Sequence, residues 1–351
     1  MRLPSVLRAV VLLAVVLDPR VLGPTVRRLT GEPRLEQWEA DGVPVEVVRP
    51  RGSGPWPTWL FVNGAHPERR EEPVVQRLSR GLARAGYLVF VPNVPGLGEG
   101  TITARTLEAT AAVTTAAMRR RDVEGGRVAL IGASTGAALA LLTAARADLA
   151  DRVSIVAAVA PFADLERMVC LATTQGYAEN GAFTRYDVAA LQRRVVARSL
   201  VAAVADEEER ARLLTALDQA EADGRDPVEA LPEPDELSPQ ARAILHVLRN
   251  DDPERFADLF RALPGDLQTL LASLSPLSTA PDVSAPVEIV VPPADVYFPL
   301  GEARALAAAL PRAHLTVTGT LDHTRPDLSL GQLRDLVSFG HFVVRGLAAA
   351  G

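Results

Sequence analysis

The residues with the clearest chemical potential run from Gly132 to Gly136 and read Gly-Ala-Ser-Thr-Gly. This G-x-S-x-G pattern follows the apolar run 128–131 and precedes the small, helix-prone run 137–142. Such an order is typical of a sharp strand-to-helix turn that lifts one serine above a sheet. The two glycines have a steric role, because the turn brings the strand and helix backbones close together. The alternative is an ordinary turn in which Ser134 only caps the helix.

A serine hydroxyl needs a base to take its proton, and the base needs a partner that fixes its orientation. Where a serine is exposed in this kind of turn, the order along the chain is nucleophile, acid, histidine. Asp295 follows the predicted strand 287–291, and His323 follows the predicted strand 315–317. Both loops should lie at the sheet edge that carries Ser134. We therefore predict that Ser134, Asp295 and His323 are catalytic residues.

Each of these assignments has an alternative. Asp295 could be a turn residue, and the competing acids are Asp322, beside His323, and Asp164, after the predicted strand 153–159. His323 could equally be a surface loop residue. Other histidines fit the role of base less well, because they lie in a helical insertion, at the start of a strand and within the last helix: His246, His314 and His341.

An acyl-transfer reaction also needs hydrogen-bond donors aimed at the developing oxyanion. The backbone N–H of Thr135, directly after the serine, is one candidate. The second should come from the loop after the predicted strand 57–62, which reads Asn-Gly-Ala-His-Pro. We predict that the Ala65 N–H is this donor. Gly64 would let the loop approach closely.

Apolar runs that read as strands alternate with helical patterns along most of the chain. This alternation favours an α/β fold with a mainly parallel sheet covered by helices on both faces. An antiparallel pair at 35–38 and 45–48 opens the sheet. The further predicted strands are 57–62, 87–91, 127–131, 153–159, 287–291 and 315–317. The predicted helices are 75–85, 106–120, 134–147, 302–310 and 330–347.

The alternation stops between about residues 163 and 281, where the chain reads as helical with no convincing strand and breaks at 224–227. Long insertions at the carboxyl edge of a parallel sheet commonly cover a binding crevice. We therefore predict a helical cap at 163–281. The α/β core would consist of 31–162 and 282–351, preceded by an apolar N-terminal segment at 1–30.

Composition limits the function classes. The net charge is −6 and 23% of residues are charged, with acids and bases interleaved, so no basic stripe indicates nucleic-acid binding. Cys170 is the single cysteine, which excludes an intrachain disulfide and a cysteine-based metal cluster. The five histidines show no metal-binding spacing. We predict no metal and no cofactor, and the oligomeric state stays open.

The N-terminal segment contains the apolar run Ala9–Leu17, preceded by Arg2 and Arg8. This order resembles the start of a signal peptide, but Asp18 follows at once and no A-x-A cleavage pattern is present. Nine residues are also too few to span a bilayer, which needs about 20. We expect a retained helix, packed on the domain or resting on a membrane surface, in a cytoplasmic or peripherally membrane-associated protein. Secretion is the competing interpretation.

Together these motifs resemble the α/β-hydrolase superfamily over about residues 35–348, in its capped esterase-like, dienelactone-hydrolase and prolyl-oligopeptidase-like branch. The matching pieces are the segment 63–65, the segment 91–98, the serine turn, Asp295 four residues before Pro299, and His323 in the last loop. The resemblance implies a nucleophile at Ser134, a base at His323 and an orienting acid at Asp295. The chain departs from the family pattern with Asn for His at 63, Asn for Asp at 93, and Pro-Pro-Ala before the acid.

The sequence therefore predicts a serine hydrolase that cleaves an ester or similar small acyl substrate. One alternative is a serine peptidase of the prolyl-oligopeptidase or aminopeptidase type. Another is a non-catalytic relative that binds a small apolar ligand beneath its cap. The complete order of serine, acid and histidine favours an enzyme.

Overall fold

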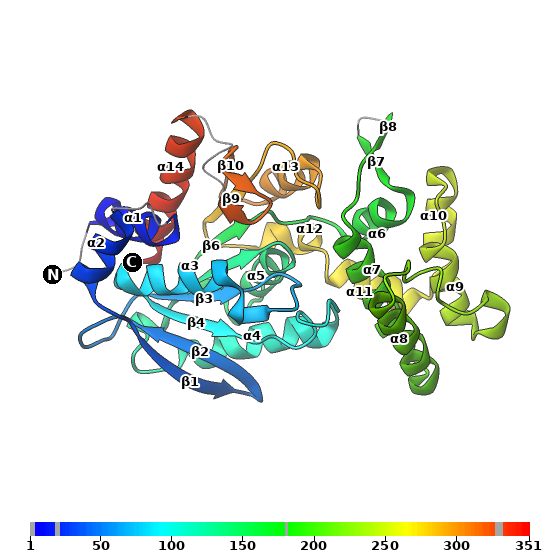
Figure 1. The fold of residues 1–351 in the computed structure, drawn as a ribbon, viewed down its shortest axis with the longest axis horizontal. Helices are drawn as coiled ribbons and strands as arrows, with labels where there is room; N and C mark the ends of the chain where they lie inside the picture. The colour runs from blue at the N-terminus through cyan, green and yellow to red at the C-terminus, as the bar shows by residue number, and fades with distance from the viewer. Residues whose placement is uncertain (1–3, 18–21, 180–181, 327–332) are drawn as a thin grey trace.

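A computed structural model describes residues 4–17, 22–179, 182–326 and 333–351. Its centre is an eight-stranded sheet in the order β1-β2-β4-β3-β5-β6-β9-β10 (Figure 1). The strands are β1 (Arg34–Ala40), β2 (Val43–Arg49), β3 (Thr58–Val62), β4 (Leu88–Pro92), β5 (Val128–Ala133), β6 (Val153–Val159), β9 (Val287–Val291) and β10 (Ala313–Val317). β1, β2 and β4 pair antiparallel, and the remaining neighbours pair parallel. This confirms the predicted α/β-hydrolase fold, including its opening antiparallel pair.

Helices cover both faces of the sheet, because the strands are apolar on both sides. In β3, Leu60 and Val62 pack against one helical layer, whereas Trp59 and Phe61 pack against the other. The first layer contains α4 (Ala104–Met118), α5 (Thr135–Ala144) and α13 (Leu300–Ala309), with the short α12 (Pro276–Thr279) packed on α5 and α13. The second layer contains α1 (Ser5–Val16), α3 (Pro73–Arg84) and α14 (Leu333–Ala350). Residues 330–332 of the predicted last helix lie outside the described residues.

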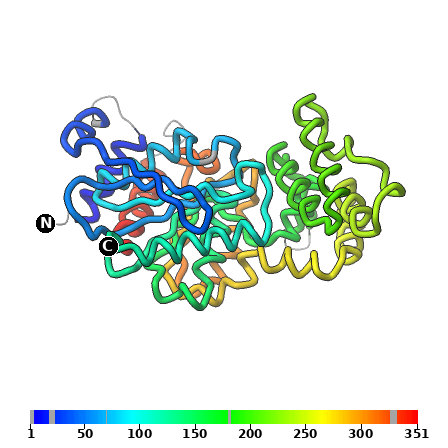
Figure 2. Tube along the Cα trace, turned by 90° about the horizontal axis from the view of Figure 1, so that it is seen from below, coloured from blue at the N-terminus to red at the C-terminus, as the bar shows by residue number. Residues whose placement is uncertain are grey.

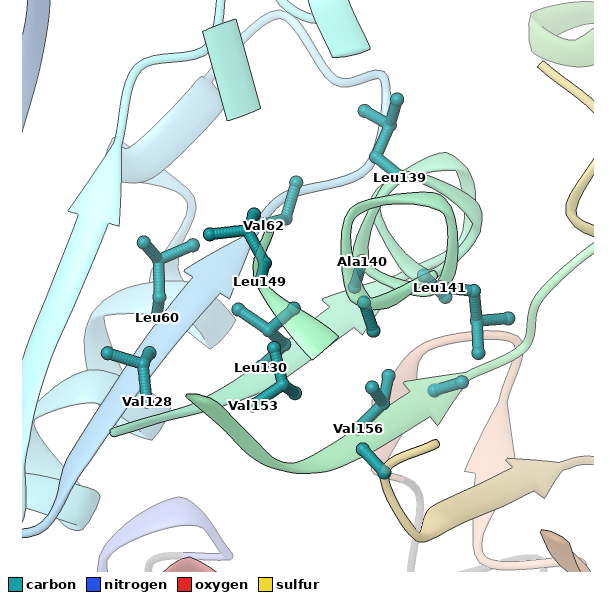
Figure 3. Packing of buried hydrophobic residues seen from close by; sticks show 14 of the residues in the cluster. Leu60, Val62, Val128, Leu130, Leu139, Ala140, Leu141, Leu149, Val153 and Val156 are labelled. Atoms are coloured by element: carbon teal, nitrogen blue, oxygen red, sulfur yellow. The ribbon is translucent and has the colours of Figure 1, made fainter. Parts of the chain in front are cut away.

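The core beneath α5 is built from interlocking aliphatic side chains. Figure 3 shows Leu60 of β3 beside Val128 and Leu130 of β5, with Leu139 and Leu141 on α5. All five are fully buried or nearly so. This packing holds the end of β5 and the start of α5 in one position, which is where the chain carries its candidate nucleophile.

The chain segment between β6 and β9 forms a second body of helices. This body extends from one end of the sheet (Figures 1 and 2). Its helices are α6 (Leu165–Thr174), α7 (Ala190–Ala202), α8 (Glu207–Ala222), α9 (Pro239–Leu248), α10 (Pro253–Arg261) and α11 (Gly265–Ser273). They enclose a second apolar cluster, which continues into the core at Ala138 of α5 and at Phe298. The prediction that this region contains no strand was wrong.

A hairpin of β7 (Gly176–Glu179) and β8 (Ala182–Arg185) interrupts the helices. α6 ends at Thr174, and the left-handed backbone of its C-cap Gln175 (φ 50) turns the chain away from the helix. The two strands have four residues each, so their alternation is too short to stand out against the surrounding helical pattern.

The N-terminal segment is helical as predicted and packs on the domain. α1 contacts α3, α14 and α2 (Leu22–Thr30). Ala9 and Leu12 are buried there, whereas Val6 and Val10 on the outer side are more than half exposed. Among the described residues, none of the helices combines the length and hydropathy that crossing a membrane requires.

Arg8 links α1 to the rest of the domain. Its side chain is buried, and its guanidinium donates to the Tyr87 hydroxyl and to the Gly351 carbonyl, each at 2.8 Å. The Arg8→Met substitution should lower the free energy of unfolding by about 1–3 kcal/mol, because buried acceptors then lose a charged donor. Urea unfolding measures this loss, and Arg28→Met, at an exposed position of α2, is the control. Equal stability of the two variants would contradict the prediction.

Candidate active site

Ser134 occupies a strained turn between β5 and α5. Its backbone has φ 53 and ψ −123, a conformation that non-glycine residues rarely adopt. The N–H of Ser134 donates to the carbonyl of Val159 at 2.8 Å, which ties the turn to the end of β6. Strain of this kind persists only where the surroundings enforce it, and it is common at functional sites.

Glycines permit the close approaches at this turn. A Cβ at Gly132 would lie 2.2 Å from the Gly136 carbonyl oxygen, and one at Gly136 would lie 2.1 Å from the Val62 carbonyl oxygen. A Cβ at Gly64 would lie 3.3 Å from the Cβ of Ser134. The first two positions therefore require glycine, as the pattern indicates. Gly64 brings the loop after β3 directly against the serine.

Asp295 and His323 lie in contact. Nδ1 of His323 is 2.8 Å from Oδ2 of Asp295, and both side chains are largely buried, at 12% and 4% exposure. The other carboxylate oxygen, Oδ1, accepts the N–H of Tyr297 at 2.7 Å and that of Phe298 at 3.4 Å. These backbone donors hold the carboxylate so that Oδ2 is directed to the imidazole.

The imidazole is also held by the shape of its loop. His323 lies in the turn of a small hairpin between β11 (Leu321–Asp322) and β12 (Arg325–Pro326), with φ 51. Its ring centroid is 4.2 Å from that of Tyr297 and 5.6 Å from that of Phe298. The sequence analysis missed both aromatic residues, although their position two and three residues after Asp295, in the loop 292–299 that we call the acid loop, was a usable signal.

The competing acids have other positions. Asp164 is the N-cap of α6, where its side chain accepts the N–H of Arg167 at 3.0 Å. Asp322 is exposed on the hairpin. The histidines considered as alternative bases are all exposed: His246, His314 and His341. Of the three acids weighed, the structure brings only Asp295 to His323.

One pocket of about 310 Å³ contains both Ser134 and His323 in its lining. The sheet side of the pocket includes Asn63, Gly64, Ala65 and Thr135. A further part of the lining comes from α6 and α7 and is mostly aliphatic: Leu165, Met168, Leu191, Gln192, Val195 and Val196. Pockets of this size and character accept small, mostly apolar ligands.

Thr135 and Ala65 are the predicted oxyanion donors, and both line this pocket. Thr135 is the first residue of α5, so its N–H lies at the positive end of the helix. In the part of the chain that the structure describes, neither N–H donates to a backbone carbonyl outside its own element. Both groups therefore keep the capacity to donate to a ligand.

Cys170 lies on α6, and burial raises the pKa of its thiol, so it is a weak candidate nucleophile. Within the described ranges, histidine, cysteine and acidic side chains form no group of three able to hold a metal ion.

The helical body contacts the acid loop through Tyr186, another residue that the sequence analysis missed. Its hydroxyl donates to the backbone carbonyl of Asp295, and its ring lies edge-on to Tyr177 at 5.8 Å. Burial raises the pKa of Tyr186, and the nearby Asp295 charge adds to this shift. The N–H of Ala189 also donates to the Val296 carbonyl at 3.3 Å. The position of the acid loop thus depends on the helical body.

Tyr186→Phe should lower kcat/KM for an ester substrate about fivefold, because the Asp295 loop loses a fixing hydrogen bond worth roughly 1 kcal/mol. Steady-state kinetics measures the effect. Tyr177→Phe is the matched control, since it removes a hydroxyl from the neighbouring ring and leaves the Asp295 contact in place. A loss of the same size in both variants would show that Tyr186 does not act through the acid loop.

The family model described as X-Pro dipeptidyl-peptidase (S15 family) matches residues 39–248, more than half of the chain. The chain belongs to this family. The match includes the Ser134 turn and much of the helical body, and it ends before Asp295 and His323. Together with the fold, it identifies an α/β-hydrolase of the serine-hydrolase type.

Solved structures share the fold of this S15-family chain. A 2,6-dihydroxy-pseudo-oxynicotine hydrolase aligns at TM-score 0.51 and 16% identity, covering 93% of this chain and 73% of the other. The acylaminoacyl peptidase of Pyrococcus horikoshii aligns at TM-score 0.52 and 10% identity, covering 92% and 41%. The dipeptidyl peptidase 4 of Porphyromonas gingivalis aligns at TM-score 0.50 and 14% identity, covering 93% and 37%. No curated protein matches the sequence.

Proposed function

We propose that this chain is a serine hydrolase that cleaves a carboxylic ester or similar small acyl substrate through Ser134, His323 and Asp295. The observation that carries the proposal is the 2.8 Å contact between Asp295 and His323 beside the pocket that Ser134 lines. A buried carboxylate on Nδ1 leaves Nε2 of the imidazole free to act as a base.

In this mechanism, the Ser134 hydroxyl attacks the substrate carbonyl while Nε2 of His323 takes its proton. Asp295 stabilises the imidazolium that forms, through the hydrogen bond from Nδ1. The backbone N–H groups of Thr135 and Ala65 would donate to the oxyanion. His323 then protonates the leaving group, and a water molecule activated by the same imidazole hydrolyses the acyl-enzyme.

The helical body from α6 to α11 would act as the cap of this site. Its support is the aliphatic wall that α6 and α7 contribute to the pocket, since apolar side chains over a reaction centre exclude water. Tyr186 connects this body to the acid loop. Substrate selection would therefore depend on cap residues, whereas the chemistry depends on the sheet edge.

A fluorophosphonate probe and a substrate panel test the proposal. The probe should label Ser134 covalently, as peptide mapping would show. A panel of p-nitrophenyl esters and aminoacyl anilides should give turnover with at least one short acyl ester. Absence of both labelling and turnover would instead support a non-catalytic relative that binds a small apolar ligand.

Family membership favours a second candidate function, cleavage of a peptide by the same three residues. A peptidase would turn over aminoacyl or X-Pro anilides more efficiently than esters of the same acyl group. Amides are intrinsically less reactive than esters. Similar kcat/KM values for an anilide and an ester of the same acyl group would therefore already favour the peptidase function.

A further inference from the structure

A second cavity lies on the face of the sheet that α1, α3 and α14 cover, and we call it the deep cavity. Its volume is about 90 Å³. Strands β3, β5 and β6 contribute Trp59, Ile131 and Ala157 to its lining. The covering helices contribute large apolar side chains, among them Leu12, Leu13, Leu82, Phe339, Phe342 and Val343.

The deep cavity borders the pocket that Ser134 lines. The two spaces have four lining residues in common: Val74, Leu78, Val159 and Thr324. Val74 and Leu78 lie on α3, Val159 ends β6, and Thr324 lies in the turn that presents His323. The side chains of one group of residues therefore face both spaces.

The strands show how the two spaces are arranged. The pocket at Ser134 is lined by Phe61, Ala133 and Val159, and the deep cavity is lined by the residues two positions earlier on the same three strands. Alternate residues of a strand point to the same face of a sheet, so the two spaces follow one another along one face. Ile131 lies three residues before Ser134, which is about 10 Å along the strand direction.

The deep cavity offers almost no hydrogen-bond partners. Among its described lining residues, none is charged, and polar side-chain groups come only from Thr324 and the indole of Trp59, whose nitrogen is buried. A peptide segment would bring N–H and C=O groups that lack partners there, whereas a hydrocarbon chain needs none. Apolar cavities of this kind stay dry and accept hydrocarbon ligands.

Gly346 of α14 keeps part of this space open. It is buried and lines the deep cavity. A Cβ at this position would meet only Cη2 of Trp59, at 4.0 Å, apart from its chain neighbours and its own helix backbone. Glycine is unfavourable inside a helix relative to alanine, and no close contact excludes a side chain here. The missing side chain therefore adds volume to the deep cavity.

We propose that the site hydrolyses esters of linear aliphatic acids, and that the acyl chain runs from Ser134 past Leu78 and Val159 into the deep cavity. An extended chain covers about 1.2 Å per bond, so an acyl group of about eight carbons reaches Ile131. The inference rests on the proposed hydrolase function and adds the substrate class.

The p-nitrophenyl esters of butanoic, hexanoic and octanoic acid test the inference, each assayed as a monomer in solution. Burial of each further methylene should raise kcat/KM about threefold to fourfold. The four methylenes between butanoate and octanoate should therefore give an increase on the order of 100-fold. Steady-state kinetics of the wild-type protein measures this ratio.

The Gly346→Leu variant places an isobutyl group in the deep cavity. It should lower the ratio of kcat/KM for octanoate to that for butanoate about tenfold or more, because the chain loses the space that it occupies. Gly340→Leu is the matched control, since it makes the same substitution on the same helix at a residue that lines neither space, where a Cβ would meet nothing within 4 Å. It should keep the wild-type ratio.

Urea unfolding checks that both variants fold. If Gly346→Leu fails to fold, Gly346→Ala replaces it, because its Cβ makes only an ordinary contact to Trp59. This smaller change should lower the ratio of octanoate to butanoate about threefold, the effect of displacing one methylene.

The outcomes separate this inference from the function on which it rests. Equal kcat/KM for butanoate and octanoate, with Ser134 labelled by a fluorophosphonate, overturns the inference and leaves the hydrolase proposal standing. A preference for octanoate that the Gly346 variants leave unchanged overturns the deep cavity as the site of the chain. An equal fall in Gly346→Leu and Gly340→Leu does so as well. Absence of labelling and of all hydrolysis overturns both proposals.

Discussion

Ser134→Ala is expected to lower kcat for ester hydrolysis on the order of 10⁶-fold, the scale of loss when a triad nucleophile is removed. Alanine has no hydroxyl to attack the carbonyl, and the remaining groups can only bind and polarise the substrate. Covalent labelling by a fluorophosphonate should disappear at the same time. Steady-state kinetics and intact-mass measurement of the labelled protein check the two effects.

Ser53→Ala is a suitable control for this variant, because Ser53 is exposed and is not part of the pocket lining. Unfolding curves should show that Ser134→Ala remains folded, since the Ser134 contact to Val159 uses the backbone N–H and not the hydroxyl. Undiminished labelling of the Ser134→Ala protein would remove this serine from the mechanism.

Asp295→Asn is expected to lower kcat by about 10⁴-fold. The N–H of Tyr297 points to one side-chain oxygen of residue 295 at 2.7 Å, so the asparagine oxygen should take that position. The amide NH2 would then face Nδ1 of His323 as a donor. Nδ1 would have to accept this hydrogen bond, and the imidazole proton would move to Nε2, where it prevents the ring from taking the serine proton.

Asp322→Asn is the matched control, because this acid neighbours His323 in the chain but is exposed. It should retain nearly all of the activity. The NMR resonance of the imidazole N–H protons would report the change of tautomer in Asp295→Asn directly. A large loss in Asp322→Asn together with a small loss in Asp295→Asn would mean that the two acids had been assigned the wrong way round.

The strands and helices of the core could be predicted because their signals are local. β5, the serine turn and α5 follow one another without interruption, so an apolar run, two glycines and a small-residue helix were sufficient. The β7–β8 hairpin could not be found in this way, since four-residue strands have too little periodicity. The β11–β12 hairpin that presents His323 is shorter still.

The sequence by itself determined the fold class and the three candidate residues for nucleophile, acid and base. It could do so because chain order and strand ends restrict which side chains can meet at one edge of a parallel sheet. Only the tertiary structure decided which acid meets His323, because Asp164 and Asp295 both follow strands, and the first is used to cap α6. It also brought Tyr186 and Gln192 from the inserted region to the site. Their places depend on how two separately packed bodies meet, and no local pattern in the chain encodes that contact.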